Sequence, residues 1–162
     1  PRDFAAGDKP GLLQLGPVRV GDVICFEVAY DPVVQDVAAG DPGLLVVQTN
    51  NATYGRTGQP DQQLAISRLR AVQTGRTVLV AATSGLSAVI AADGHVVAGS
   101  HEFERWVYDG PVTVRTGTTP ATRLGAWPEL ILGTLGLGAV AVAIVRRRRE
   151  RSPSHHASSA AA

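Results

Sequence analysis

The sequence predicts an α/β domain followed by one transmembrane helix. Apolar, β-branched runs alternate with helical patterns over the first half of the chain, as expected for strands joined by helices. The dipeptide Asp93-Gly94 lies between two apolar runs and predicts a β-hairpin. An uncharged stretch from Leu130 to Val145, followed at once by consecutive arginines, is typical of a membrane span.

The composition narrows the class of protein. The chain has 162 residues, of which 44% are hydrophobic and 18% charged, values typical of a globular protein. The net charge of the chain is +1, and the arginine cluster at 146–151 supplies more positive charge than that. The rest of the chain is therefore net acidic, which does not favour binding to nucleic acid. A single cysteine excludes an intrachain disulfide and a thiolate-rich metal site. The absence of methionine indicates the C-terminal piece of a longer protein.

The expected strands and helices follow from apolar periodicity and from turn residues. Residues 1–17, which contain several Pro and Gly residues, are expected to form a loop. We then expect strands at 18–24, 44–47 and 77–83, helices at 32–39 and 60–74, a hairpin of 86–92 with 95–98, and strands at 105–108 and 112–115.

Local signals set the ends and faces of the two helices. Asp31 is expected to cap the first helix, because it precedes Pro32 at the first helical position. Gly40 and Gly75 are expected to end the two helices. The second helix is expected to bury an apolar stripe made of Leu64, Ala65, Leu69 and Val72.

Cys25 lies where the first strand gives way to a turn and then a helix. A nucleophile at that place projects from the carboxyl end of a strand, and backbone N–H groups of the turn can face the group it attacks. The alternative is a buried structural thiol, because free cysteine is among the most buried residue types. The polar loop 50–55 follows the second strand, and its residues either bind substrate or merely form the turn.

The chain after residue 115 is expected to reach and cross a membrane. We expect a linker at 116–126, a transmembrane helix at 127–145 and a disordered basic tail at 146–162. The segment 127–145 would span about 28 Å as a helix, close to a hydrocarbon core of about 30 Å. Trp127 would lie at one interface, and the arginines place the C-terminus in the cytoplasm and the domain on the outer face. A buried core helix is the alternative.

Several motifs, taken in order, resemble the nitrilase superfamily. They are Ile24-Cys25-Phe26-Glu27, Asn50-Asn51-Ala52-Thr53-Tyr54-Gly55, Gln62-Gln63, Arg68-Leu69-Arg70-Ala71, Ser84-Gly85 and Asp93-Gly94. Residues 15–149 resemble more closely the C-terminal half of the apolipoprotein N-acyltransferases. Thr118-Thr119-Pro120, Gly125-Ala126-Trp127-Pro128 and the apolar helix with its arginine-rich end support that narrower resemblance.

The resemblance implies an αββα sandwich, of which residues 1–115 form the C-terminal half, and a Glu–Lys–Cys triad. Cys25 matches the nucleophile, the backbone N–H of Phe26 would stabilise the oxyanion, and Glu27 would orient the site. The triad Glu and Lys lie before the cysteine in the family, and nothing in residues 1–24, Lys9 included, matches them. The isolated piece is therefore expected to be inactive.

The resemblance also implies the reaction and its partners. A phospholipid would donate an acyl chain to Cys25 as a thioester, and the N-terminal amine of a diacylated apolipoprotein would accept it. Asn50 and Tyr54 would bind substrate, and neither a cofactor nor a metal is expected. The enzyme would lie in the bacterial inner membrane, with the catalytic domain on the extracytoplasmic face.

Two other functions remain open from the sequence. One is a membrane-anchored amidase of nitrilase type, in which water replaces the amine as acceptor. The other is a non-enzymatic, membrane-tethered module in which Cys25 is structural. Glu27 could likewise be a surface carboxylate in a salt bridge rather than an orienting group.

Overall fold

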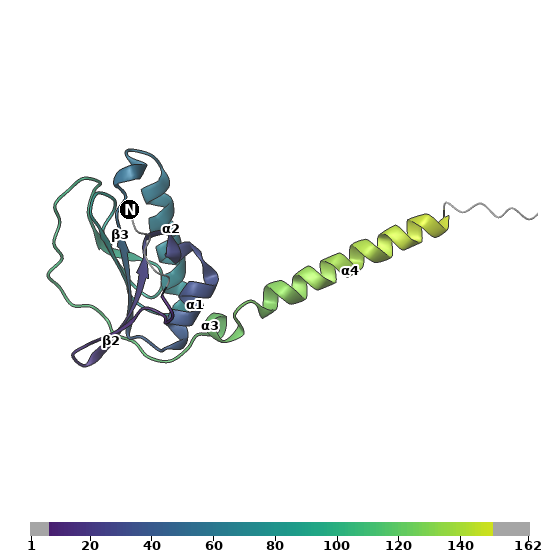
Figure 1. The fold of residues 1–162 in the computed structure, drawn as a ribbon, viewed down its shortest axis with the longest axis horizontal. Helices are drawn as coiled ribbons and strands as arrows, with labels where there is room; N and C mark the ends of the chain where they lie inside the picture. Colours follow the sequence, from purple (N-terminus) through teal and green to yellow (C-terminus); the bar gives the residue numbers. More distant parts are fainter. Residues whose placement is uncertain (1–6, 151–162) are drawn as a thin grey trace, which may run out of the picture. The chain divides into compact units, whose positions relative to one another are not determined.

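A six-stranded mixed sheet forms the centre of the unit that ends at Arg123 (Figure 1). The computed structural model describes residues 7–150, and Leu124 begins a second unit, which is described separately below. The elements of the first unit are β1 (Leu12–Leu15), β2 (Val18–Ile24), the 3₁₀ helix η1 (Cys25–Ala29), α1 (Asp31–Ala39), β3 (Leu44–Thr49), η2 (Ala52–Tyr54), α2 (Gln59–Thr74), β4 (Val78–Ala82), β5 (Ala88–Ile90), β6 (Val96–Gly99) and α3 (Pro120–Leu124).

The strands lie in the sheet in chain order, from β1 to β6. The central strands β2, β3 and β4 are parallel, whereas β1, β5 and β6 join them antiparallel. The connections through α1 and α2 both step in the same direction across the sheet, so right-handed crossovers place both helices on one face. Figure 1 shows these two helices beside each other. The predicted strand–helix alternation and the Asp93-Gly94 hairpin are confirmed.

The hydrophobic core lies between that face of the sheet and the two helices. Strand residues such as Val23, Leu45 and Val78 pack there against Val34 and Ala71 of the helices. Their alternation along each strand follows the two-residue period of β structure. The opposite face is less covered, because Val46 is only half-buried and Gln48 is exposed. The apolar run 44–47 is therefore fully covered on one face only.

The loop expected over residues 1–17 contains a strand. Leu12–Leu15 pairs antiparallel with β2, and Leu15 lies opposite Val18. The two residues between these partners include Gly16, whose φ of 57° few other residues adopt readily. Two of the Pro and Gly residues that indicated a loop, Gly16 and Pro17, thus form the turn of a hairpin. Residues 1–6 lie outside the described part of the chain.

Both predicted helices form, but the cap of α1 is not the expected one. Asp31 is the first residue of α1, and no side chain caps that end. The carboxylate of Asp31 instead forms an ion pair with Arg70 of α2. Gly40 and Gly75 end the helices as predicted, and Gly75 adopts the left-handed conformation.

The buried face of α2 is mostly polar, and of the predicted apolar stripe only Leu64 packs against the core, whereas Ala65, Leu69 and Val72 are exposed. Leu69 and Val72 are 61% and 52% exposed. The buried residues of the helix are Pro60, Gln63, Ser67, Arg70, Ala71 and Thr74. The hydroxyls are satisfied within the helix, since Ser67 donates to the Gln63 carbonyl at 2.8 Å and Thr74 to the Arg70 carbonyl at 2.7 Å. The burial of these two hydroxyls therefore costs little free energy.

Residues 105–108 and 112–115 are not strands, contrary to prediction. This segment is irregular and is tied to the domain by single hydrogen bonds. The Arg115 N–H donates to the Gly43 carbonyl at 3.0 Å, and the Thr77 hydroxyl donates to the Thr113 carbonyl at 2.7 Å. The β-branched composition that indicated strands has no pairing partner here. In the expected linker, residues 120–124 form the short helix α3.

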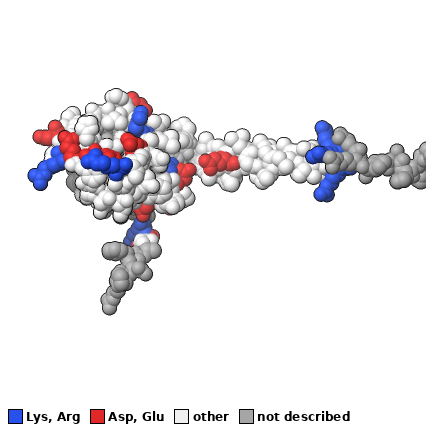
Figure 2. All heavy atoms as spheres, turned by 90° about the horizontal axis from the view of Figure 1, so that it is seen from above, with Lys and Arg blue, Asp and Glu red and all other residues white. Residues whose placement is uncertain are grey.

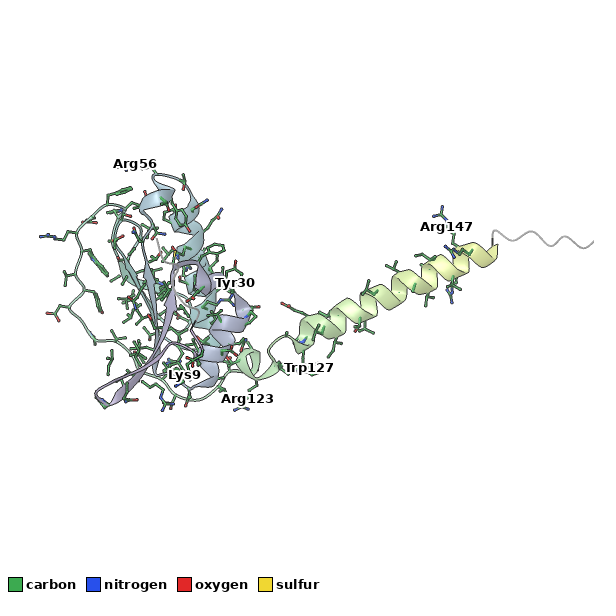
Figure 3. All side chains as sticks on the ribbon, viewed as in Figure 1. Lys9, Tyr30, Arg56, Arg123, Trp127 and Arg147 are labelled. Atoms are coloured by element: carbon green, nitrogen blue, oxygen red, sulfur yellow. The ribbon has the colours of Figure 1, made fainter. Side chains whose placement is uncertain are left out.

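The second unit contains the long helix α4 (Trp127–Glu150). Residues Trp127–Arg148 are long and apolar enough to cross a membrane, with a mean hydropathy of 2.0 in the most apolar window. Side chains project on every side of α4, with Trp127 and Arg147 near opposite ends (Figure 3). Figure 2 shows a stretch without charged atoms that ends at the arginines. The helix continues through Glu150, so residues 146–150 are not the disordered tail that was expected; 151–162 lie outside the described residues.

Candidate functional site

The carboxyl ends of β2, β3 and β4 meet at one edge of the sheet. In the parallel register, Ile24 lies opposite Gln48, and Thr49 lies opposite Ala82. The residues that follow these strands are Cys25, the loop 50–55 and Thr83. In open α/β sheets, ligands bind beyond the carboxyl ends of the strands. This edge therefore brings together the polar residues that the sequence singled out.

Cys25 begins the 3₁₀ helix η1 directly after β2, as the predicted strand-to-helix turn requires. Its φ is 53°, a conformation that residues with a side chain adopt at an energetic cost. The thiol is free and half-buried. The alternative of a structural cysteine requires a thiol enclosed in the core, and the Cys25 thiol is not enclosed there.

Glu27 holds the backbone that leads into this turn. Its Oε2 accepts a hydrogen bond from the Ile24 N–H at 2.8 Å, which satisfies a donor at the start of η1. Among the described residues, neither of the two ion pairs includes Glu27. Glu27 therefore contacts the residue before Cys25, and its orienting role stays a prediction.

Arg70, which the sequence did not single out for the site, holds η1 from the other end. Its guanidinium is buried and donates from Nε to the Val28 carbonyl at 2.7 Å and from Nη2 to the Ala29 carbonyl at 3.0 Å. It also forms the ion pair with Asp31. A fork of donors with this geometry is specific to arginine. One side chain of α2 thereby fixes the junction of η1 and α1.

Tyr54 and Asn50, the two predicted substrate-binding residues, have different surroundings. The Cys25 thiolate charge raises the pKa of Tyr54, and desolvation and a hydrogen bond to Cys25 add to this effect. Tyr54 is therefore close enough to Cys25 for the charge of that residue to act on its pKa. Asn50 Oδ1 instead accepts from the Ala52 N–H at 3.1 Å and from the Thr83 hydroxyl at 2.8 Å. Asn50 links the loops after β3 and β4, as a turn-forming residue does.

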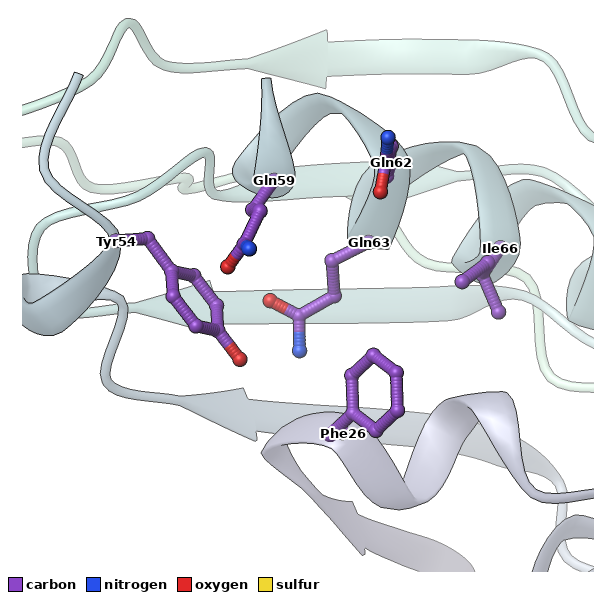
Figure 4. Close-up of a pocket in the computed structure, with 6 residues that line it drawn as sticks. All are labelled: Phe26, Tyr54, Gln59, Gln62, Gln63 and Ile66. Carbon is purple, nitrogen blue, oxygen red and sulfur yellow. The ribbon is translucent and has the colours of Figure 1, made fainter. Parts of the chain in front are cut away.

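A cavity of about 410 Å³ lies next to Tyr54. It is lined by Phe26, Tyr54, Gln59, Gln62, Gln63 and Ile66 (Figure 4). The buried Gln63 accepts hydrogen bonds at Oε1 from Asn51 Nδ2 at 2.7 Å and from the Thr49 hydroxyl at 3.3 Å. Neither Gln63 nor Asn51 was predicted to have a role of its own. The spacing of polar residues 63, 67, 70 and 74 along one helix face was the signal that could have found Gln63.

Lys9 does not line this cavity. It lines another cavity, of about 520 Å³, together with Asp22, Glu27 and Asp36. Among the described residues, Lys9 forms no ion pair. That Lys9 is not the triad lysine stays a prediction. In the described residues, no group of three or more His, Cys, Asp or Glu side chains could hold a metal ion.

The profile of the carbon-nitrogen hydrolases matches residues 4–132, which include Cys25 and the whole cavity. The chain belongs to the carbon-nitrogen hydrolase family. The predicted nitrilase-type α/β fold is confirmed by a solved member of that superfamily, Nit3 of Saccharomyces cerevisiae, described as a member of its branch 10. The TM-score is 0.53 at 20% identity, and the match covers 63% of this chain and 40% of that one.

Curated relatives within this carbon-nitrogen hydrolase family carry a narrower name. Apolipoprotein N-acyltransferase of Mycolicibacterium smegmatis is 34% identical over 146 residues, covering 90% of this chain and 24% of that protein. The protein of the same name from Azotobacter vinelandii is 36% identical over 152 residues, covering 93% and 28%. The chain thus spans about a quarter of the length of the curated relatives it matches. The predicted resemblance to this group is confirmed.

Proposed function

We propose that this chain is part of an N-acyltransferase whose nucleophile is Cys25. In the first half-reaction, the Cys25 sulfur attacks the ester carbonyl of a phospholipid. The C–S bond forms, the ester C–O bond breaks, and the lysophospholipid oxygen leaves with a proton. In the second, the N-terminal amine of a diacylated lipoprotein attacks the thioester. The C–N bond forms, the C–S bond breaks, and the thiol is regenerated with the amine's proton.

The observation that carries the proposal is the accessible thiol at the carboxyl end of β2. Its positive φ and the backbone contacts of Glu27 and Arg70 support a role that requires a fixed sulfur position. The first N–H groups of a helix lack intrahelical partners, so the Phe26 N–H is suited to stabilise an oxyanion on the attacked carbonyl. The general base and the lysine of the family triad would come from polypeptide that precedes this chain.

The long apolar helix supports the choice of lipid substrates. Trp127–Arg148 would hold the catalytic domain at the surface of the bilayer that contains both the phospholipid and the lipoprotein. The arginines after Val145 would lie in the cytoplasm, and the domain would then lie outside the inner membrane. An anchored amidase would share this helix but would use water as the acceptor.

The test is to trap the thioester on the full-length protein. Incubation with phospholipid is expected to add one acyl group to the Cys25 peptide, detected by mass spectrometry, and a diacylated lipopeptide is expected to remove it. Cys25→Ala is expected to abolish both signals and all N-acylation. Acylated lipopeptide formed by the Cys25→Ala protein would contradict the proposal. Release of the acyl group to water at the same rate with and without lipopeptide would indicate the amidase instead.

A further inference from the structure

The amide of Gln63 is held in one orientation by its neighbours. The side chain is only 5% exposed, and its Oε1 already accepts from Asn51 Nδ2 and the Thr49 hydroxyl. A carbonyl oxygen has two lone pairs, so both are used. Turning the Gln63 amide alone would set its NH₂ group against the NH₂ group of Asn51. The donor side of the amide must therefore face away from this pair.

That donor side has no partner in the described part of the chain. Gln63 Nε2 is buried and makes no hydrogen bond. Figure 4 shows it directed between the Tyr54 hydroxyl and the Phe26 ring, at the cavity of about 410 Å³. A buried donor without an acceptor is unfavourable, and ligand sites place a few such polar groups in otherwise apolar walls. The cavity therefore presents a hydrogen-bond donor to whatever occupies it.

The walls of the cavity select the kind of acceptor. All six lining side chains are neutral, and Phe26 and Ile66 offer apolar contacts. A phosphate or a carboxylate would lack a cation to pair with there. An uncharged carbonyl oxygen with carbon atoms on either side suits both the donor and the apolar walls.

We propose that Gln63 is a substrate-binding residue whose Nε2 donates a hydrogen bond to an uncharged carbonyl oxygen of the substrate. The inference rests on the proposed function, because Phe26, the residue that follows Cys25, lines this cavity. The carbonyl belongs either to an ester of the phospholipid donor or to the lipopeptide acceptor. In both cases Gln63 Nε2 donates to an uncharged carbonyl oxygen. Separate rate measurements of the two half-reactions distinguish the phospholipid from the lipopeptide.

Gln63→Glu in the full-length protein tests the inference. The Glu side chain keeps an oxygen for Asn51 and Thr49 and replaces only the donor that faces the cavity. Gln35→Glu is the matched control, since Gln35 lies in α1 and does not line this cavity. We expect Gln63→Glu to raise the half-saturating concentration of one substrate by about tenfold or more, because an acceptor would then face an acceptor. The control is expected to leave both concentrations unchanged.

Two rate measurements identify the source of the carbonyl. Thioester formation is measured against phospholipid concentration, and thioester loss against diacylated lipopeptide concentration. A change confined to the first assigns the carbonyl to the donor, and a change confined to the second assigns it to the acceptor. If the Glu variant does not fold, Gln63→Met removes the donor without adding a charge, and the same change is expected.

Two results would overturn the inference. One is unchanged half-saturation for both substrates in a folded Gln63 variant. The other is an equal loss in both half-reactions together with a lowered Tm, which would indicate a merely structural amide. A wild-type protein that forms no thioester on Cys25 would contradict the proposed function itself, so the two failures are distinguishable.

Discussion

Tyr54 is linked to Cys25 by its electrostatics. The charge of Cys25 is the largest cause of the raised pKa of Tyr54, and the Tyr54 hydroxyl is a hydrogen-bond donor. We therefore predict that this hydroxyl donates a hydrogen bond to the Cys25 sulfur. A hydrogen bond of this kind stabilises the reactive form of the nucleophile.

Removal of the Tyr54 hydroxyl should slow the alkylation of the Cys25 thiol. Tyr54→Phe in the full-length protein is expected to lower the rate at which iodoacetamide alkylates Cys25 at pH 7, by about threefold to tenfold, because one hydrogen bond to the thiolate is lost. The measurement is mass spectrometry of the Cys25 peptide over time. Tyr30→Phe is the matched control, since Tyr30 packs edge-on against Phe26 and is exposed. Equal rates for both variants would disprove the role of Tyr54.

The residues of the site were not equally predictable. Cys25 could be found because strand and helix signals are local and the only cysteine lies between them. Gln63 could not be assigned a role, because its burial and its unpartnered Nε2 depend on where α2 packs. The pairing of Tyr54 with Cys25 likewise depends on the parallel register of β2 and β3, which no local pattern specifies.

At the level of elements, α2 supports η1 through one buried cation. Arg70 donates to two carbonyls at the end of η1 and pairs with Asp31 at the start of α1. These carbonyls lie where a 3₁₀ helix ends, and such groups need partners from elsewhere. The position of Cys25 at the other end of η1 is therefore coupled to the packing of α2.

Loss of Arg70 is expected to destabilise the domain. Arg70→Met would leave the Val28 and Ala29 carbonyls and the Asp31 carboxylate without their donor, at a cost of about 3 kcal/mol in the free energy of unfolding. Arg68→Met, in the same helix, removes only a hydrogen bond from an exposed side chain to the Gly94 carbonyl and should cost about 1 kcal/mol or less. Urea denaturation of the full-length variants measures both values. Similar losses for the two variants would argue against a special role for Arg70.

Helix existence was easier to predict than helix burial. The bounds of α1 and α2 differ by one residue from the expected ones, because Pro, Gly and apolar periodicity mark helix ends locally. The face of α2 was wrong since its polar residues find partners inside the fold while Leu69 and Val72 remain exposed. The strand β1 was missed because it is short and is stabilised by pairing with β2.

In the molecule as a whole, one sheet edge gathers the candidate site, and one helix is long and apolar enough to cross a membrane. The two units are joined after Arg123, and the charge distribution around α4 is uneven. Arg146–Arg149 and Arg151 follow the apolar segment, whereas Arg115 and Arg123 are the basic residues shortly before it. Basic residues near the end of a span favour the cytoplasmic side, so this excess sets the expected orientation.

The orientation can be measured with reporters fused to the full-length protein in bacterial cells. A fluorescent protein placed after Ala162 should fluoresce and alkaline phosphatase at the same position should be inactive, because the arginine-rich end is expected to stay in the cytoplasm. Fusion of the same reporters after Gly117, with α4 removed, is the control and should give the opposite pattern. Active phosphatase after Ala162 would place the catalytic domain in the cytoplasm. That result would separate Cys25 from an extracytoplasmic lipoprotein acceptor and exclude the proposed transfer.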